Sequence, residues 1–257
     1  MKRLRILLSV IAVLTSSSLA YGFGGCGQDC SECHSISPSV AESALRPLMP
    51  DVMVEQVGMA PAKGLWEVVF KSRGKKNVAY LDFALQNIIV GQIVQIQTKN
   101  NLTFERLTEV NKVDVSKIPL DNSLVLGSSD AKYKIVVFSD PDCPFCGKYH
   151  QEMKNIVKSR RDIAFFIKLF PLDAHKDARR KSESIMCKRS LEMLEDAFSK
   201  KPVPDPTCDS DVVSSTIALG KKLGITGTPA TILPDGRLIP GYVEAPKILN
   251  LLDKKSL

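Results

Sequence analysis

The stretch Lys134-Ile-Val-Val-Phe-Ser-Asp-Pro-Asp-Cys-Pro-Phe-Cys-Gly-Lys-Tyr-His150 passes from β-branched and aromatic residues into a polar run that suits a helix. Cys143 and Cys146 therefore lie where a predicted strand gives way to a predicted helix. Unpaired N–H groups and the helix dipole stabilise a thiolate at such a position, and Pro144 fits the first turn because it needs no N–H partner. We predict that Cys143 is a nucleophile and that Cys146 is the less exposed thiol that resolves a mixed disulfide.

The residues around the two cysteines leave other interpretations open. Asp140 and Asp142 disfavour a thiolate, and we expect the helix terminus to outweigh them because it lies closer to Cys143. A zinc half-site is disfavoured because no second ligand pair follows at zinc-finger spacing, so no metal is expected. An inert structural disulfide is a further alternative. His150 raises the question of a proton relay, but we expect an exposed helix histidine there.

The first 20 residues are typical of an export signal. A basic start is followed by the apolar run 6–14 and by small residues up to position 20. Because that run is too short to span a bilayer, we predict a cleaved signal peptide at 1–20 and an oxidising compartment for the rest. Of the 35 basic residues three lie in this segment, which leaves 32 against 28 acidic ones and no reason to expect a nucleic-acid partner.

A cysteine-rich segment, 21–36, follows the predicted signal. Besides Cys26 it contains Cys30-Ser-Glu-Cys33-His34, which is the attachment sequence for a c-type haem with His34 as the iron ligand. A local disulfide between two of the three cysteines, or an auxiliary redox or metal site, is the alternative. We favour the disulfide or thiol interpretation over haem.

Residues 37–100 are predicted to form an N-terminal domain of mostly antiparallel strands. A short helix is expected at 37–48, since Ser37 is a favourable N-cap residue. Strands are predicted at 52–57, 65–71, 77–83 and 87–97, with a turn at Arg73-Gly74-Lys75. Because roughly 60 residues make a marginal core, we expect this domain to need a partner surface, most simply a second copy of itself.

The second half of the chain predicts a strand–helix–strand unit with a helical insertion. Residues 101–127 are interpreted as a linker helix, 101–110, and a connection. Beyond 128, the strand before Cys143 and the apolar run 163–170 are expected to be parallel neighbours joined by the helix that starts at Cys143. Residues 172–223 form the insertion, with helices predicted at 174–200 and 209–223.

Two further features lie in and after the insertion. Cys187 and Cys208 are most simply a structural disulfide in an exported protein, which contributes about 3 kcal/mol on the chain-entropy model. In the segment 224–233, Thr228-Pro229 opens a predicted strand, and an X-Pro bond is expected to be trans on sequence statistics alone. A hairpin turn at 234–237, its return strand at 238–242 and a final helix at 245–252 complete the chain.

Taken together, Cys143-Pro-Phe-Cys146 after an apolar strand and Gly227-Thr-Pro-Ala230 further along resemble the thioredoxin fold of disulfide oxidoreductases. With the export signal, the β-rich N-terminal region and the linker helix, the chain after about residue 36 is similar to the periplasmic disulfide isomerases of the DsbC/DsbG family. The resemblance implies an α+β, cystatin-like dimerisation domain at 37–100, followed by the linker helix and an α/β thioredoxin-like domain at 128–257.

The resemblance also implies a site, partners and a location. Pro229 would be cis, with the backbone at Thr228 and Pro229 pairing to an extended substrate strand. A periplasmic homodimer would act on misfolded disulfide-containing exported proteins, kept reduced by a DsbD-type membrane reductant, and exchange would need no cofactor. The chain has Pro-Phe between its cysteines where DsbC has Gly-Tyr, which leaves the balance of isomerase, reductase and oxidant open.

The predicted function is therefore isomerisation or reduction of non-native disulfides through Cys143 and Cys146. Three alternatives are kept: a thiol oxidant on the same fold, a holdase chaperone that binds substrates in an apolar cleft, and an electron-transfer protein with haem at Cys30, Cys33 and His34.

Overall fold

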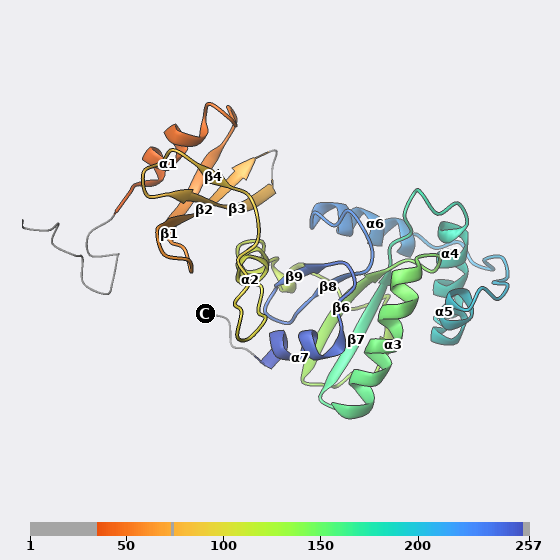
Figure 1. Ribbon diagram of the computed structural model, residues 1–257. Helices are drawn as coiled ribbons and strands as arrows, with labels where there is room; N and C mark the ends of the chain where they lie inside the picture. Colours follow the sequence, from red (N-terminus) through yellow and green to blue (C-terminus); the bar gives the residue numbers. More distant parts are fainter. Residues whose placement is uncertain (1–34, 73–74, 254–257) are drawn as a thin grey trace, which may run out of the picture.

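The computed structural model describes residues 35–72 and 75–253, and contains two β-sheets (Figure 1). The first sheet has four strands in the order β1-β2-β3-β4, and the second has five in the order β5-β7-β6-β8-β9. No helix within the described ranges is long and apolar enough to cross a membrane.

The first sheet is antiparallel and is covered by one helix on each face. It consists of β1 (Met53–Met59), β2 (Leu65–Ser72), β3 (Lys75–Asp82) and β4 (Ile88–Ile89). On one face, Trp66 and Val68 pack against Ala41 and Leu45 of α1 (Pro38–Leu45), whose N-cap is Ser37. The predicted turn residues Arg73 and Gly74 lie outside the described residues.

The prediction of a strand over 87–97 is wrong for most of its length. Only Ile88 and Ile89 pair with β3, because the chain then turns towards α2 (Leu102–Val110). The backbone N–H of Ile93 donates to Thr103 Oγ1 at 2.9 Å, and its carbonyl accepts from Leu102 N at 2.9 Å. Backbone groups that a longer strand would pair within the sheet are therefore used to anchor the linker helix.

Helix α2 connects the two parts of the chain through contacts with both. Leu107 and Val110 pack on Val69 and Val78 of the first sheet, while Phe104 packs against the core of the second domain. After α2 comes a short 3-10 helix, η2 (Val115–Lys117).

The second sheet places two long strands side by side at its centre. β6 (Tyr133–Ser139) and β7 (Ile163–Leu169) are parallel, and β7 is buried along its whole length. β5 (Leu124–Leu126), β8 (Ala230–Ile232) and β9 (Leu238–Pro240) extend the sheet with antiparallel pairing. A central strand buried on both faces explains the continuous apolar run in the sequence.

Helices cover both faces of this sheet, as Figure 1 shows. α3 (Pro144–Ser159) and α7 (Ala245–Asp253) contribute Tyr149, Met153 and Ile248 to the larger core. α6 (Val212–Lys222) contributes Ile217 and Leu219 to the core on the Val136, Phe138 and Phe166 side.

The single helix predicted over 174–200 is two helices, α4 (Ala178–Lys188) and α5 (Leu191–Phe198). Arg189 adopts a left-handed conformation with φ 48°, and Ser190 then caps α5 by accepting a hydrogen bond from Met193 N at 3.1 Å. Periodicity continues across this break, so only the backbone reveals it.

Candidate active site

The two cysteines of the CxxC sequence lie at the start of α3, directly after β6. Cys143 is the N-cap residue and Pro144 is the first helical residue. Cys143 is 5% exposed and Cys146 is 1% exposed, and both are free thiols in this structure. The predicted nucleophile is thus the more accessible of the two.

A loop from the far end of the sequence contacts Cys143. Cys143 Sγ lies 3.4 Å from the carbonyl oxygen of Thr228, and the Thr228–Pro229 peptide bond is cis. The trans bond that X-Pro statistics alone predict is therefore wrong, and the cis bond that the resemblance implies is confirmed. The carbonyl of Pro229 accepts a hydrogen bond from Gly241 N at 2.8 Å, which fixes the loop beside β9.

The environments of the two thiols move their pKa values in opposite directions. The pKa of Cys143 is lowered to about 5, first by a hydrogen bond with the Cys146 thiol and further by the backbone N–H groups of Cys146 and Phe145, against the effect of burial. Burial, and then the neighbouring Cys143, raise the pKa of Cys146. The pair is therefore arranged as one thiolate and one buried thiol at neutral pH.

The two carboxylates expected to oppose the thiolate have partners of their own. Asp140 is fully buried and accepts hydrogen bonds from the N–H of Asp142 at 2.7 Å and of Leu172 at 2.7 Å. Asp142 forms an ion pair with Lys181 of α4 at 2.5 Å. Sequence reasoning missed Lys181, because nothing in the sequence shows which face of α4 lies over the dithiol.

His150 was expected to be an exposed helix histidine, and that prediction is wrong. Its side chain is 0% exposed because α5 covers this face of α3. Nε2 lies 3.0 Å from Glu195 Oε1, which also pairs with Lys154 Nζ at 2.9 Å, and the ring lies against Phe198. Burial lowers the pKa of His150, with Glu195 acting in the opposite direction.

The pKa shift of His150 makes folding stability depend on pH. Because the folded-state pKa is below the ordinary 6.5, the unfolded chain binds more protons, and the free energy of unfolding should fall as pH drops below about 6.5. In His150→Gln, whose amide can still hydrogen-bond to Glu195 but does not titrate, we expect this acid-dependent loss to shrink. Urea unfolding of the oxidised protein at several pH values measures it, since disulfide-bonded cysteines do not titrate.

His175→Asn provides the matched control. The pKa of His175 is raised, chiefly by its hydrogen bond with Asp140, so this residue stabilises the fold at low pH and loses that effect as pH rises. Its removal should therefore steepen the acid-dependent loss. Identical pH profiles for His150→Gln and the unmodified protein would contradict the prediction.

One pocket adjoins the dithiol, and a second lies beside the loop that carries Thr228. One, of about 340 Å³, includes Cys143 and is bounded by α3 and by residues around the end of α5, among them Glu195 and Phe198. The other, of about 180 Å³, includes Thr228 and runs along β9. Phe145, between the cysteines in sequence, is 62% exposed. The surface around the dithiol and the Thr228–Pro229 loop therefore offers an exposed aromatic ring and two recesses.

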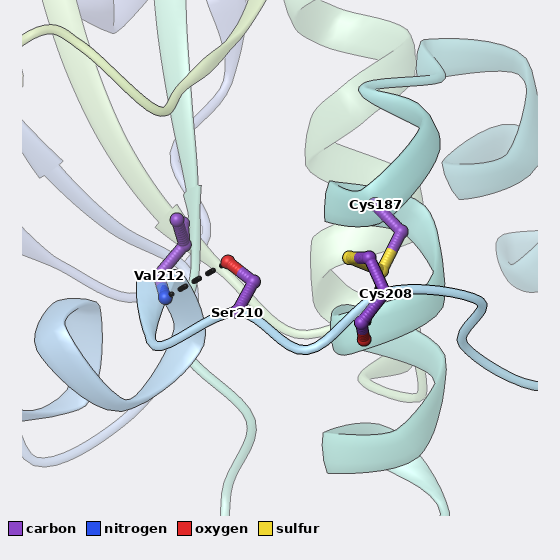
Figure 2. The surroundings of a disulfide bond; sticks show 4 residues. All are labelled: Cys187, Cys208, Ser210 and Val212. Carbon is purple, nitrogen blue, oxygen red and sulfur yellow. Dashed lines mark hydrogen bonds between the residues drawn. A yellow bond between two sulfur atoms is a disulfide. The ribbon is translucent and has the colours of Figure 1, made fainter.

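A disulfide joins Cys187, at the end of α4, to Cys208, in the segment before α6 (Figure 2). Two residues after Cys208, Ser210 Oγ accepts a hydrogen bond from Val212 N at 3.3 Å, at the start of α6. The disulfide thus links the segment before α6 to α4, which is the helix that carries Lys181.

The N-terminal candidates, Cys30, Cys33 and His34, and the predicted signal peptide at 1–20 lie outside the described residues. Among residues 35–72 and 75–253, no group of three or more His, Cys, Asp or Glu side chains is arranged to hold a metal ion.

A cysteine pair at the N-terminus of a helix, next to a cis-proline loop and on a central parallel strand pair, defines a thioredoxin-like disulfide oxidoreductase. The model of the thioredoxin-like domain matches residues 120–256, and the model of the disulfide bond isomerase protein N-terminal domain matches residues 33–104. The chain belongs to the DsbC family of thiol:disulfide interchange proteins. Disulfide exchange in this family needs no cofactor, and the family offers no support for the haem alternative.

The similarity extends over most of the chain. The thiol:disulfide interchange protein DsbC of Escherichia coli K12 is 27% identical over 205 residues, which cover 76% of this chain and 79% of that protein. The probable DsbC of Bordetella avium is 24% identical, over 74% of this chain and 66% of that protein. The crystal structure of a disulfide interchange protein from Neisseria gonorrhoeae is 30% identical, covers 52% of this chain and 96% of that one, and has a TM-score of 0.44.

Proposed function

We propose that this protein isomerises or reduces non-native disulfides in exported proteins, with Cys143 as the nucleophile and Cys146 as the resolving thiol. The observation that supports this most directly is the asymmetry of the pair: a thiolate at the helix N-terminus and a buried thiol behind it. A pair with two similar thiols would not separate attack from resolution in this way.

The chemistry is two successive exchanges. The Cys143 thiolate attacks one sulfur of a substrate disulfide, so that a mixed disulfide forms and the other substrate sulfur leaves as a thiolate. If a second substrate thiolate attacks the mixed disulfide, Cys143 is regenerated and the substrate is isomerised. If Cys146 attacks instead, its proton passes to the medium, the substrate leaves reduced, and the enzyme becomes a disulfide.

Substrate binding is assigned to the loop that contacts Cys143. The Thr228 carbonyl lies 3.4 Å from Cys143 Sγ, so a chain paired with the backbone at Thr228 and Pro229 would bring its own disulfide to that sulfur. Exposed Phe145 provides an apolar contact for an unfolded segment.

Similarity to the DsbC family supports a proposal for the assembly and the location. We infer a periplasmic homodimer formed through the N-terminal domain, where Met53, Val90 and Ile96 are exposed apolar residues. Isomerisation requires a reduced pair, so a DsbD-type membrane reductant is the inferred partner.

Recovery of a scrambled multi-disulfide protein in a glutathione buffer tests the function. We expect recovery to disappear with Cys143→Ser and to survive in part with Cys146→Ser, because a substrate thiol can still resolve the mixed disulfide. Both variants keep Cys187 and Cys208, so the disulfide between α4 and the segment before α6 is unchanged. Recovery that survives Cys143→Ser would refute the assignment of the nucleophile.

One observation favours an oxidant as the second candidate. A thiolate with a pKa of about 5 stabilises the reduced pair, which makes the corresponding disulfide a stronger oxidant. Fast oxidation of a reduced substrate without any recovery of the scrambled one would support this candidate. Suppression of aggregation by Cys143→Ser would show that a holdase activity accompanies either chemistry.

A further inference from the structure

His175 is a titratable side chain next to the dithiol that the proposed exchange mechanism leaves unused. It lies in the loop between β7 and α4, with its side chain 28% exposed. Its Nδ1 lies 2.9 Å from Oδ2 of Asp140, which is itself fully buried. When the imidazole takes up or releases a proton, the net charge of the His175–Asp140 pair changes, although the carboxylate itself stays buried.

Asp140 connects this pair to both cysteines. Its backbone N–H donates to Cys146 Sγ at 3.4 Å, and its carbonyl accepts from Cys143 N at 3.1 Å. Its carboxylate also accepts from Leu172 N, so the loop that carries His175 is fixed to the end of β6. A change of charge at the imidazole therefore occurs within the hydrogen-bonded unit that holds the dithiol.

The other charges that face His175 are few. They are Asp140 itself, Asp142, whose charge is offset by Lys181 of α4, and Cys143 when it is a thiolate. All three acidic groups favour the protonated imidazole, and Cys143 is the only one whose charge changes when the dithiol is oxidised.

We propose that His175 is a positioning residue that couples its own proton to the redox state of the dithiol, by offsetting the buried charge of Asp140 behind Cys143. This inference rests on the proposed role of Cys143. On oxidation, the Cys143 thiolate and the Cys146 thiol form one S–S bond and give two electrons to the substrate disulfide, whose S–S bond breaks. The Cys146 proton goes to the medium or to a leaving thiolate.

The thiolate charge is lost in that step, and with it one of the groups that hold the proton on His175. Because coupling between two sites is reciprocal, a proton on His175 must in turn favour the thiolate of Cys143. The protein should therefore release more protons on oxidation when His175 is present than when it is absent.

An NMR titration of the full chain tests the coupling. The chain has three histidines, so comparison with His175→Asn assigns the imidazole signal directly. We expect His175 to titrate at a lower pH in the oxidised protein than in the reduced one. Equal titration midpoints in the two redox states would overturn the proposal.

A second measurement follows the Cys143 thiolate by its ultraviolet absorbance. His175→Asn keeps a donor at the position of Nδ1 but removes the charge, and we expect the thiolate fraction at pH 4 to fall about three- to tenfold. His175→Asn combined with Asp140→Asn removes both charges and should return the fraction towards its original value. If only His175→Ala lowers the fraction, the hydrogen bond and not the charge matters, and the proposal is wrong.

Cys143→Ser separates this outcome from failure of the proposed function. The thiolate titration should vanish in that variant. If it persists, the nucleophile is misassigned and the proposed function fails; if it vanishes in Cys143→Ser, but His175→Asn leaves the thiolate titration of Cys143 unchanged, the inference alone fails.

Discussion

Iodoacetamide added to the reduced protein at pH 6 is expected to alkylate Cys143 about ten- to twentyfold faster than the same cysteine in the unfolded chain. With its pKa lowered from 9.0 to about 5, roughly a thousand times more of the thiol is ionised at this pH. A thiolate of lower pKa is also a weaker nucleophile, and over this range of pKa its reactivity falls about 40- to 100-fold. Dividing the gain in ionisation by this loss of reactivity gives the expected net acceleration.

The alkylation rates of the two cysteines should depend on pH in different ways. Alkylation should be nearly constant above pH 6 and should fall below about pH 5, where Cys143 becomes protonated. Cys146, whose pKa is raised and whose side chain is 1% exposed, should remain unmodified until Cys143 has reacted or the protein unfolds. Mass spectrometry of peptides measures both sites. An inflection near pH 9 for Cys143, or equal labelling of the two, would contradict the model of an asymmetric pair.

Gly236→Ala is expected to destabilise the protein by about 2–5 kcal/mol. Gly236 lies in the β8–β9 hairpin with φ +92°, which costs a residue with a side chain about 1–2 kcal/mol. A Cβ atom there would also overlap the carbonyl oxygen of Val113, just after α2, and overpacking of this kind costs about 1–3 kcal/mol. Urea unfolding measures the loss.

The same contact fixes the segment after α2 to the thioredoxin-like domain. Val113 N donates to the Gly236 carbonyl at 2.8 Å, so movement of the hairpin should release the segment after α2 and increase its cleavage by proteases. Gly224→Ala is the matched control, because Gly224 has φ +77° but no atom within 4 Å of an added Cβ. It should lose only the conformational part. Equal destabilisation of the two variants would show that the contact with Val113 is unimportant.

Local sequence patterns were sufficient to predict the elements around the dithiol. The β-branched run before Cys143, and Pro144 in the first helical turn, predict the strand end and helix start that the structure has at β6 and α3. Apolar run 163–170 likewise predicts the parallel partner β7, because strands joined by a single helix pair in that direction. These features depend on neighbours in sequence.

Local patterns failed where backbone groups found distant partners. The segment 87–97 has strand-like alternation, yet Ile93 bonds to the start of α2 instead of to the sheet. The long periodic stretch 174–200 breaks at Arg189, because one residue in the left-handed conformation changes the helix direction without disturbing the pattern. Periodicity shows which side is apolar and does not show where the backbone turns.

The sequence alone was enough to predict an attacking and a resolving thiol and to place the pair at a helix N-terminus, because those predictions depend on residues a few positions apart. Only the tertiary structure decided their electrostatic surroundings. The carbonyl of Thr228, the Asp140–His175 pair and Lys181 come from separate segments that the sheet and α4 bring together. The tertiary structure also buries His150 beneath α5, since the burial of a helix face depends on which other helix packs on it.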